Sequence, residues 1–200
     1  MKLYQNIVYN QIRSGERVID LGCGDGALLQ ALRNHKQCDG YGIEKNFKEV
    51  VMAIQSGIPV YQGDVLEGLR SFDNQVFDVA ILSQTLQQIM DPIELLNEMG
   101  RVAKRVIITF PNFGYWRVRF HLLFQGQSPK TKQLPFDWFN TPNIRVITIK
   151  EFRLLCKQLG FVIQKEIPLV KSGIQRMLFP LRLTNLMTEK GIFIIQKQMP

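Results

Sequence analysis

The chain has 200 residues, of which 46% are hydrophobic and 21% are charged, so it can bury a sizeable core and is not expected to be disordered. Its three cysteines lack zinc-site spacing, and the sequence shows neither a signal peptide nor a membrane span, so we expect a cytoplasmic protein with reduced thiols and no metal. The net charge of +8 combines −5 in residues 1–100 with +13 in residues 101–200, which indicates either an anionic partner or a solvated basic face.

In chain order, apolar spacing and capping residues predict strands and helices that alternate at short intervals. This alternation predicts an α/β fold in one domain over residues 1–200, with a mainly parallel seven-stranded sheet and helices on both faces. The predicted elements are helix 4–13, strand 17–21, helix 27–34, strand 38–44, helix 46–57, strand 58–64, strand 77–83, helix 91–103, strand 105–112, helix 149–160, strand 161–170 and strand 192–198.

Residues 113–147 interrupt the alternation with a stretch rich in aromatics, proline, lysine and arginine. The stretch is long for a plain connection, and such loops are often lids or binding elements. Aromatic and arginine side chains are enriched at protein interfaces, so we expect a packed lid or an interface. Stacking on RNA is the alternative, but the Asn/Asp-Pro-Pro-aromatic stretch common in enzymes that modify nucleobase amino groups is missing after the fourth strand, so we do not expect a nucleic-acid partner.

The stretch "RVIDLGCGDGALLQAL" carries glycines at positions 22, 24 and 26, between a strand and a helix. Glycine there permits close backbone approach and positive φ, and the helix it opens offers free N–H groups. The G-x-G-x-x-G dinucleotide spacing is matched only if Ala27 takes the third position. The carboxylate of Asp20, just before the loop, would repel a pyrophosphate but would attract the cationic group of an amino acid.

Two more acids end the next two predicted strands. Glu44 lies 22 positions after Gly22, close to the offset at which a carboxylate takes ribose hydroxyls. Asp64 ends the third strand, where it can accept from an adenine amino group. The three acids and the glycine loop describe a pocket for a nucleoside with a positive amino-acid tail, although a nicotinamide cofactor remains an alternative.

This constellation resembles the class I S-adenosylmethionine-dependent methyltransferase fold, Rossmann-like in architecture. The resemblance implies S-adenosylmethionine or S-adenosylhomocysteine as cofactor. The cofactor-binding residues that we expect are Asp20, Gly22, Cys23, Gly24, Gly26, Glu44, Asp64, Val65 and Ser83. The loop thiol of Cys23 is expected to pack rather than to act as a nucleophile.

A finer resemblance is carried by "VIDLGCGDGALLQAL", "ILSQTLQ", "FPNFG", "LPFDWFNTPNI" and "TIKEF", which together span about residues 18–152. These stretches resemble the methionine biosynthesis protein W (MetW) family. The resemblance implies a cytoplasmic protein of methionine biosynthesis that pairs with homoserine O-acyltransferase and supports its activity. The chain departs from the family pattern at Arg145, where histidine is common, and after Glu44, where a second acid is common.

Methyl transfer needs alignment and sometimes a base. The candidates are Tyr115 and His121, the latter four residues after Arg117 and therefore on the same face if this part is helical. His35 is expected on the solvated end of the second helix. Two hypotheses follow: a cofactor-binding partner or regulator of homoserine O-acyltransferase, and a methyltransferase that acts on a small molecule.

Overall fold

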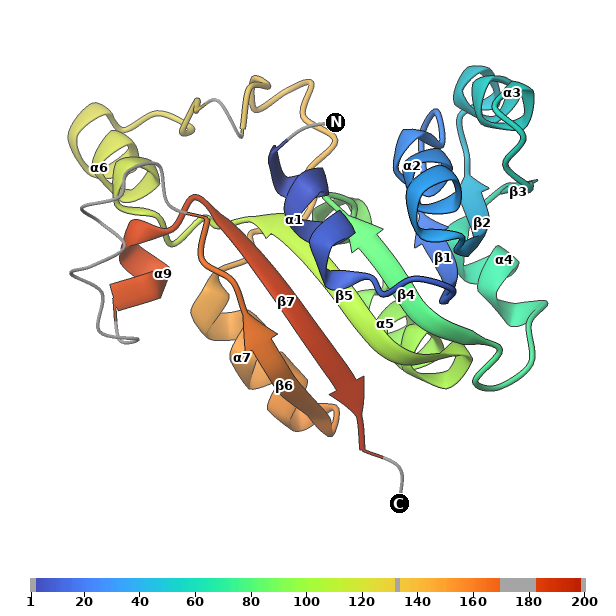
Figure 1. Cartoon of the computed structure of the whole chain (residues 1–200). Helices are drawn as coiled ribbons and strands as arrows, with labels where there is room; N and C mark the ends of the chain where they lie inside the picture. Colours follow the sequence, from blue (N-terminus) through green and yellow to red (C-terminus); the bar gives the residue numbers. More distant parts are fainter. Residues whose placement is uncertain (1–2, 132–133, 170–182, 199–200) are drawn as a thin grey trace.

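The computed structural model describes residues 3–131, 134–169 and 183–198. Within these residues a single sheet contains seven strands: β1 (Arg17–Leu21), β2 (Asp39–Glu44), β3 (Val60–Gln62), β4 (Phe77–Ser83), β5 (Ala103–Pro111), β6 (Phe161–Glu166) and β7 (Lys190–Lys197). Their spatial order is β3-β2-β1-β4-β5-β7-β6, as Figure 1 shows. The chain steps outward from β1 to β3 and then returns to β4, which creates a topological switch point between β1 and β4. Ligands of open α/β sheets bind at such a point, beyond the carboxyl ends of the strands.

The sheet is mainly parallel, as the sequence predicts. Strands β1 to β5 pair in parallel, and β7 runs antiparallel to both β5 and β6. The centre of β4, Val79–Leu82, is completely buried, as expected for a strand that is covered on both faces. Asp20 pairs with Gly42 on one side and with Ile81 on the other, so it lies in the middle of the sheet.

Nine helical segments connect or flank these strands in the described part of the chain. They are α1 (Leu3–Gln11), α2 (Ala27–Lys36), α3 (Phe47–Gln55), α4 (Val65–Arg70), η1 (Leu86–Gln88), α5 (Pro92–Val102), α6 (Trp116–Gln125), α7 (Ile149–Gln158) and α9 (Thr184–Met187). The carboxyl ends of β4 and β5 point toward the region where the start of α1, the segment after α6 and α6 itself lie (Figure 1).

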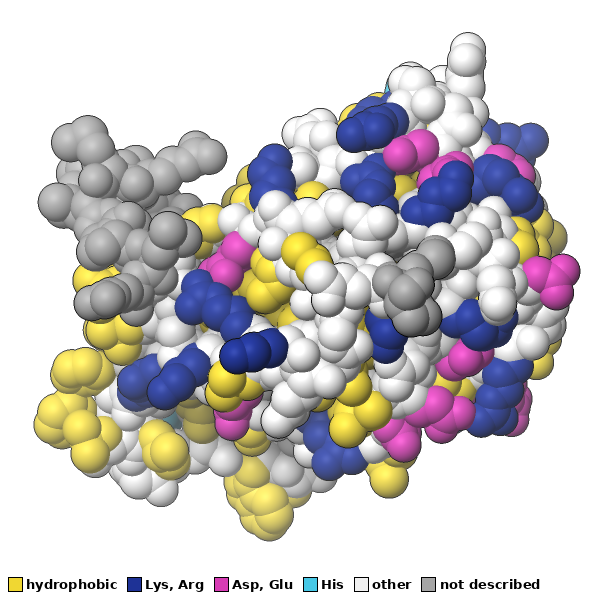
Figure 2. All heavy atoms as spheres, turned by 90° about the horizontal axis from the view of Figure 1, so that it is seen from below, with side chains coloured by type: hydrophobic (Ala, Val, Ile, Leu, Met, Phe, Trp, Pro, Cys, Tyr) yellow, Lys and Arg dark blue, Asp and Glu magenta, His cyan; other side chains and the backbone are white. Residues whose placement is uncertain are grey.

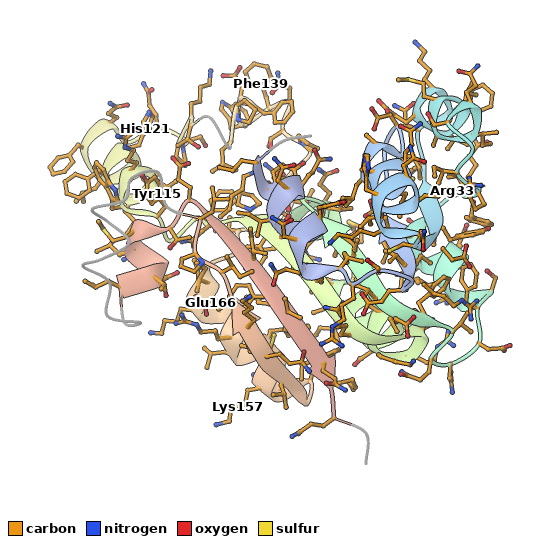
Figure 3. The ribbon with its side chains drawn as sticks, in the orientation of Figure 1. Arg33, Tyr115, His121, Phe139, Lys157 and Glu166 are labelled. Atoms are coloured by element: carbon orange, nitrogen blue, oxygen red, sulfur yellow. The ribbon has the colours of Figure 1, made fainter. Side chains whose placement is uncertain are left out.

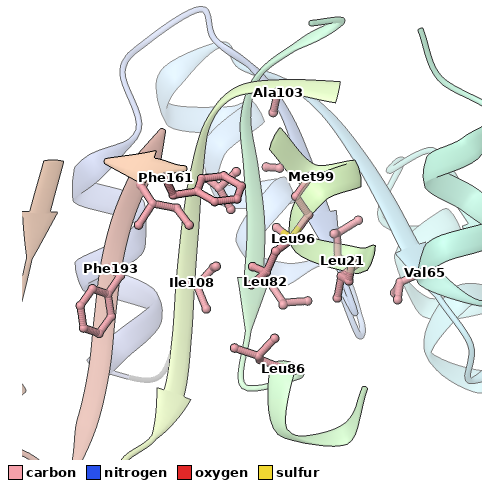
Figure 4. Packing of buried hydrophobic residues seen from close by; sticks show 14 of the residues in the cluster. Leu21, Val65, Leu82, Leu86, Leu96, Met99, Ala103, Ile108, Phe161 and Phe193 are labelled. Carbon is pink, nitrogen blue, oxygen red and sulfur yellow. The ribbon is translucent and has the colours of Figure 1, made fainter. Parts of the chain in front are cut away.

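Each face of the sheet has its own hydrophobic core, because alternate strand residues point to opposite faces. Val79 and Ile81 of β4 pack with residues of α1, α2 and α3. Ala80 and Leu82 pack with residues of α4, α5 and α7. Figure 4 shows part of this second core, with Leu82 beside the α5 residues. The two cores confirm the prediction of helices on both faces.

Several element boundaries differ from the predictions. The predicted strand 58–64 ends at Gln62, because Asp64 instead caps α4, a helix that the sequence did not indicate to us. Part of the irregular stretch 113–147 is helix α6. The predicted strand 161–170 ends at Glu166, and its residue 170 and most of the basic segment 171–190 lie outside the described residues. None of the helices in the described ranges is both long and apolar enough to cross a membrane.

Candidate functional site

The glycine loop after β1 needs glycine for its backbone. Gly22, Gly24 and Gly26 have φ angles of 76°, 57° and 74°, a region that residues with a Cβ rarely adopt. The backbone N–H groups of Gly22 and Cys23 both donate to the carbonyl oxygen of Ile43, at 2.8 and 3.2 Å. These two bonds fasten the loop to β2.

The three glycines differ in the space around them. A Cβ at Gly22 would lie 2.8 Å from Oγ1 of Thr85, and a Cβ at Gly26 would lie 3.0 Å from Cβ of Ala53. A Cβ at Gly24 would meet nothing closer than a carboxylate oxygen of Glu49, at 3.8 Å. The outer two glycines therefore permit packing against other elements, whereas a Cβ at Gly24 would make only an ordinary contact with Glu49.

Glu44, the last residue of β2, holds the loop through its carboxylate. Oε2 accepts the backbone N–H of Gly24 at 2.9 Å, and Oε1 accepts that of Asn46 at 2.8 Å. A carboxylate offers about four acceptor positions, so each oxygen keeps one for a ligand. The predicted placement of Glu44 beside the glycine loop agrees with this geometry.

Asp20 is a buried carboxylate, only 4% exposed, close to the loop. Its Oδ1 has no hydrogen-bond partner among the described residues. Burial, with a smaller contribution from the charge of Glu44, raises the pKa of Asp20 to about 8. The charge of Asp20 also affects Tyr4 of α1. Burial, with a smaller contribution from the charge of Asp20, raises the pKa of the Tyr4 hydroxyl. A cationic group placed beside Oδ1 would satisfy the buried oxygen and favour the ionised acid.

The end of β4 forms the next part of the rim. Oγ of Ser83 is buried and has no partner within the described ranges, whereas its carbonyl accepts from Oγ1 of Thr85 at 3.2 Å. Gln84 has a positive φ of 59°, and its backbone and side chain both donate to Oγ1 of Thr109 on β5. These bonds hold Thr85 against Gly22, a neighbour that sequence spacing could not reveal.

Asp64 and Val65 begin α4. Oδ1 of Asp64 accepts the N–H of Leu66 at 2.8 Å, and the side chain is exposed. Its second oxygen, Oδ2, therefore remains available. Val65 is buried in the core on the α4 side of the sheet, so its side chain contributes to packing.

Cys23 packs against β2. A Cβ at Gly42 would lie 2.5 Å from Sγ of Cys23, so the absence of a side chain at Gly42 makes room for the thiol. Burial, followed by the charges of Asp20 and Glu44, raises the pKa of this thiol well above its usual range. The protonated thiol is a poor nucleophile, in keeping with the expected packing role.

The two candidate bases lie away from the loop. Tyr115 is 7% exposed in a small hydrophobic cluster with Val118 and Leu134. His121 lies on α6, half-buried, and its Nδ1 has no hydrogen-bond partner within the described segments. Figure 3 shows both residues at the α6 end of the molecule, on the opposite side from α2, which follows the glycine loop. His35 is exposed near the end of α2, as expected.

Asn112, in the "FPNFG" stretch, joins three distant segments. Its Oδ1 accepts the N–H groups of Gly114 and Ile149 at 2.9 and 3.2 Å. Its Nδ2 donates to the carbonyl oxygens of Asn185 and Thr188, both at 2.8 Å. The side chain is 1% exposed, so this stretch has a structural role that the sequence did not reveal to us.

The irregular stretch is fastened to the turn after β4. The N–H groups of Ile144 and Arg145 both donate to the carbonyl oxygen of Gln87, at 2.9 and 3.0 Å. The Arg145 guanidinium also donates to the carbonyl oxygens of Ile89 and Met90. Arg145 therefore holds the irregular stretch against the turn after β4, at the rim of the candidate site.

Three known proteins give a context for this geometry. A bifunctional methionine biosynthesis protein MetXA/MetW of Rhodopirellula baltica is 41% identical over 165 residues, which are 78% of this chain and 26% of that protein. This chain thus spans about a quarter of that relative's length. A solved S-adenosylmethionine-dependent methyltransferase of Thermotoga maritima has a TM-score of 0.67 at 18% identity, covering 98% of this chain and 88% of that one. The cyclase SpnF has a TM-score of 0.68 at 16% identity, covering 98% and 81%.

The two structural likenesses show the fold, which is the Rossmann-like fold of class I methyltransferases. They show nothing about the reaction, because one fold hosts many functions. A family model described as "Methionine biosynthesis protein MetW" matches residues 3–195. The chain therefore belongs to the MetW family of methionine biosynthesis proteins.

Proposed function

We propose that the chain binds S-adenosylmethionine or S-adenosylhomocysteine at the glycine loop and acts as a partner and regulator of homoserine O-acyltransferase. The observation that carries the first part is the hydrogen bond between Glu44 and Gly24, close to a buried oxygen of Asp20 that has no partner in the described part of the chain. The second part rests on family membership and on the relative from Rhodopirellula baltica, whose name joins MetXA and MetW in one protein.

The residues present fit the cofactor. Oδ1 of Asp20 suits the ammonium group of the methionine moiety, and the spare acceptor positions of Glu44 suit ribose hydroxyls. Oδ2 of Asp64 suits the adenine amino group. The lack of a side chain at Gly24 lets the loop backbone approach the ligand. When bound, S-adenosylmethionine would supply a methyl group activated by its sulfonium.

A regulatory role agrees better with the candidate bases than methyl transfer does. Tyr115 is enclosed in its own hydrophobic cluster, and His121 lies on α6. Figure 3 places both side chains at the α6 end of the molecule, away from α2, which follows the glycine loop. A site without a base can still bind one ligand or the other. Because Arg145 is hydrogen-bonded to the turn after β4, a change in which ligand is bound could alter the position of the surface segment that carries Arg145.

A second candidate function is methyl transfer to a small molecule. The irregular stretch encloses a cleft of about 230 Å³, which is enough for a small acceptor. Phe113, Leu134, Trp138, Asn143 and Arg145 are among its lining residues. These residues offer apolar walls with a few polar groups, as small-molecule sites usually do.

Both functions require ligand binding, which calorimetry measures. We expect both ligands to bind the wild-type protein, and we expect Glu44→Ala and Gly24→Val to weaken binding at least about tenfold. Glu67→Ala, on the exposed surface of α4, is the matched control and should bind as the wild type does. Co-elution with homoserine O-acyltransferase and a changed acyl-transfer rate would support the regulator. A methyl-labelled product in cell extract, lost in Asp20→Ala, would support the methyltransferase instead.

A further inference from the structure

One end of the molecule exposes a group of large apolar side chains that the proposed cofactor site does not use. We call this group the aromatic surface; its members are between 47% and 76% exposed. They are Phe120, Leu122, Leu123 and Phe124 of α6, together with Phe136, Trp138, Phe139 and Val146. An exposed apolar patch of this kind usually marks a binding surface.

The two parts of the aromatic surface are joined by packing. Val118 of α6 and Leu134 share a small hydrophobic cluster with Tyr115. Along α6, the rings of Trp116, Phe120 and Phe124 form a ladder with centroid distances of 5.8 and 5.2 Å. Figure 2 shows hydrophobic side chains gathered at the left-hand end of the molecule, the end where α6 lies in Figure 1. Helix α6 and the segment that begins at Leu134 are therefore packed against each other through this cluster.

The charge around the aromatic surface is basic. Residues 113–147 contain five lysines and arginines and a single acid, Asp137, which pairs with Lys130. Helix α6 carries Arg117 and Arg119 and no acid. A complementary occupant therefore combines apolar and acidic groups. A second copy of this chain fits poorly, because a symmetric contact would set one basic patch against another.

The shape of α6 favours a protein groove over a lipid surface. At about 100° per residue, Leu122 lies roughly 200° around the helix from Phe120, and these side chains are 59% and 52% exposed. A helix that lies on a membrane buries one face. Helix α6 presents apolar side chains on more than one side, so a flat membrane surface would leave some of them in water, whereas a groove in a partner protein can contact more than one side of the helix.

We propose that the aromatic surface is the docking site for homoserine O-acyltransferase, which would receive α6 in an apolar groove rimmed by acidic side chains. This inference rests on the proposed function. The same stretch reaches the rim of the cofactor site, since Ile144 and Arg145 donate to the carbonyl oxygen of Gln87. An enzyme docked here touches a segment that is fixed to that rim, so occupancy of the site can alter how the enzyme is held.

The test measures binding of the purified full-length chain to homoserine O-acyltransferase from the same organism. Leu123→Glu and Phe139→Glu each place a negative charge on the aromatic surface, at side chains that are 75% and 69% exposed. We expect each change to weaken binding at least about tenfold, as for central interface residues. Ile54→Glu, 55% exposed on α3, is the matched control and should bind normally. All variants should keep the wild-type melting temperature and affinity for S-adenosylhomocysteine.

The other outcomes each contradict the proposal in a different way. If the wild type binds the acyltransferase and both surface variants bind equally well, the docking site is wrong while the proposed function stands. If the wild type does not bind the enzyme at all, the proposed function fails, and the docking site fails with it. The wild type could instead sediment with vesicles of phosphatidylglycerol and phosphatidylcholine. If Leu123→Glu abolishes this sedimentation and leaves enzyme binding unchanged, the surface binds a membrane. A wild-type dimer that the variant splits would assign it to self-association.

Discussion

The carboxylate of Glu44 and the backbone of Gly24 position one another: Oε2 accepts the Gly24 N–H at 2.9 Å, while Oε1 accepts the N–H of Asn46 at 2.8 Å. One side chain at the end of β2 thus ties the glycine loop to the start of α3. A residue that orders the loop and faces the proposed ribose position should affect both folding and ligand binding when it is changed.

Replacing Glu44 by glutamine tests this double role. The amide has only one acceptor oxygen, so its NH₂ group would face either the N–H of Gly24 or that of Asn46. We expect a loss of about 1–2 kcal/mol in the free energy of unfolding and at least about tenfold weaker binding of S-adenosylhomocysteine. Urea unfolding and calorimetry measure the two effects, with Glu67→Gln as the control. Unchanged binding in Glu44→Gln would remove this residue from the proposed site.

The three loop glycines should respond differently to alanine. Gly24→Ala adds a methyl group that makes no contact closer than 3.8 Å, so it should reduce stability only by the strain of its positive φ, about 1 kcal/mol. It should nevertheless weaken ligand binding, because the ligand would lie against this part of the loop. Gly26→Ala places Cβ 3.0 Å from Ala53 and should destabilise the protein more. Equal loss of stability in both variants, with ligand binding intact in Gly24→Ala, would contradict the assignment.

Asp20 predicts an unusual dependence of stability on pH. Its pKa is about 8 in the folded protein against 3.8 in the unfolded chain, so between these values the folded state binds more protons. The free energy of unfolding should therefore fall as the pH rises from about 4 to about 8, by at most about 1.4 kcal/mol per unit for this group. Asp20→Asn should flatten the slope, which thermal melts at several pH values would show.

The raised pKa of Asp20 also predicts that ligand binding releases a proton. An ammonium group beside Asp20 favours the ionised carboxylate, so binding below pH 8 should expel a proton, and the affinity should rise with pH up to about 8. Calorimetry in two buffers that differ in ionisation enthalpy measures the proton directly. No proton release at pH 6.5 in the wild type, or the same release in Asp20→Asn, would count against this contact.

Asn112 should matter for stability. Asn112→Ala leaves two N–H groups and two carbonyl groups without their side-chain partner in a buried site. We expect a loss of about 2–4 kcal/mol in the free energy of unfolding, since buried unsatisfied groups are costly. Asn34→Ala, on the exposed side of α2, should change it by less than about 0.5 kcal/mol. Similar urea midpoints for both variants would contradict the structural role of this motif.

The sequence predicted the parts of the site that depend on strand alternation. Asp20 and Glu44 lie where predicted because parallel strands bring their carboxyl ends to one edge of the sheet. The glycine loop was predicted because its positive φ angles require glycine. The mainly parallel order of the sheet followed from the same alternation.

Other features depend on contacts that local patterns do not encode. Asp64 reads equally well as a strand end and as a helix cap, and only the structure shows that it caps α4. Helix α6 has a weak periodic signal because it buries only Val118. The partners of Asn112 at Asn185 and Thr188 are 73 and 76 residues away. Thr85 lies next to Gly22 because β4 pairs in parallel with β1, and these two residues are too far apart in sequence for a local pattern to link them.

The proposed function requires that the glycine loop binds the cofactor and that this binding is coupled to binding of the acyltransferase. The most direct test is a calorimetric titration of the chain with S-adenosylhomocysteine, alone and in complex with homoserine O-acyltransferase. We expect a saturable 1:1 isotherm in both cases, with dissociation constants that differ at least about fivefold, the scale of an ordinary coupling free energy. No binding in either titration would contradict the cofactor site, and equal dissociation constants would contradict the coupling.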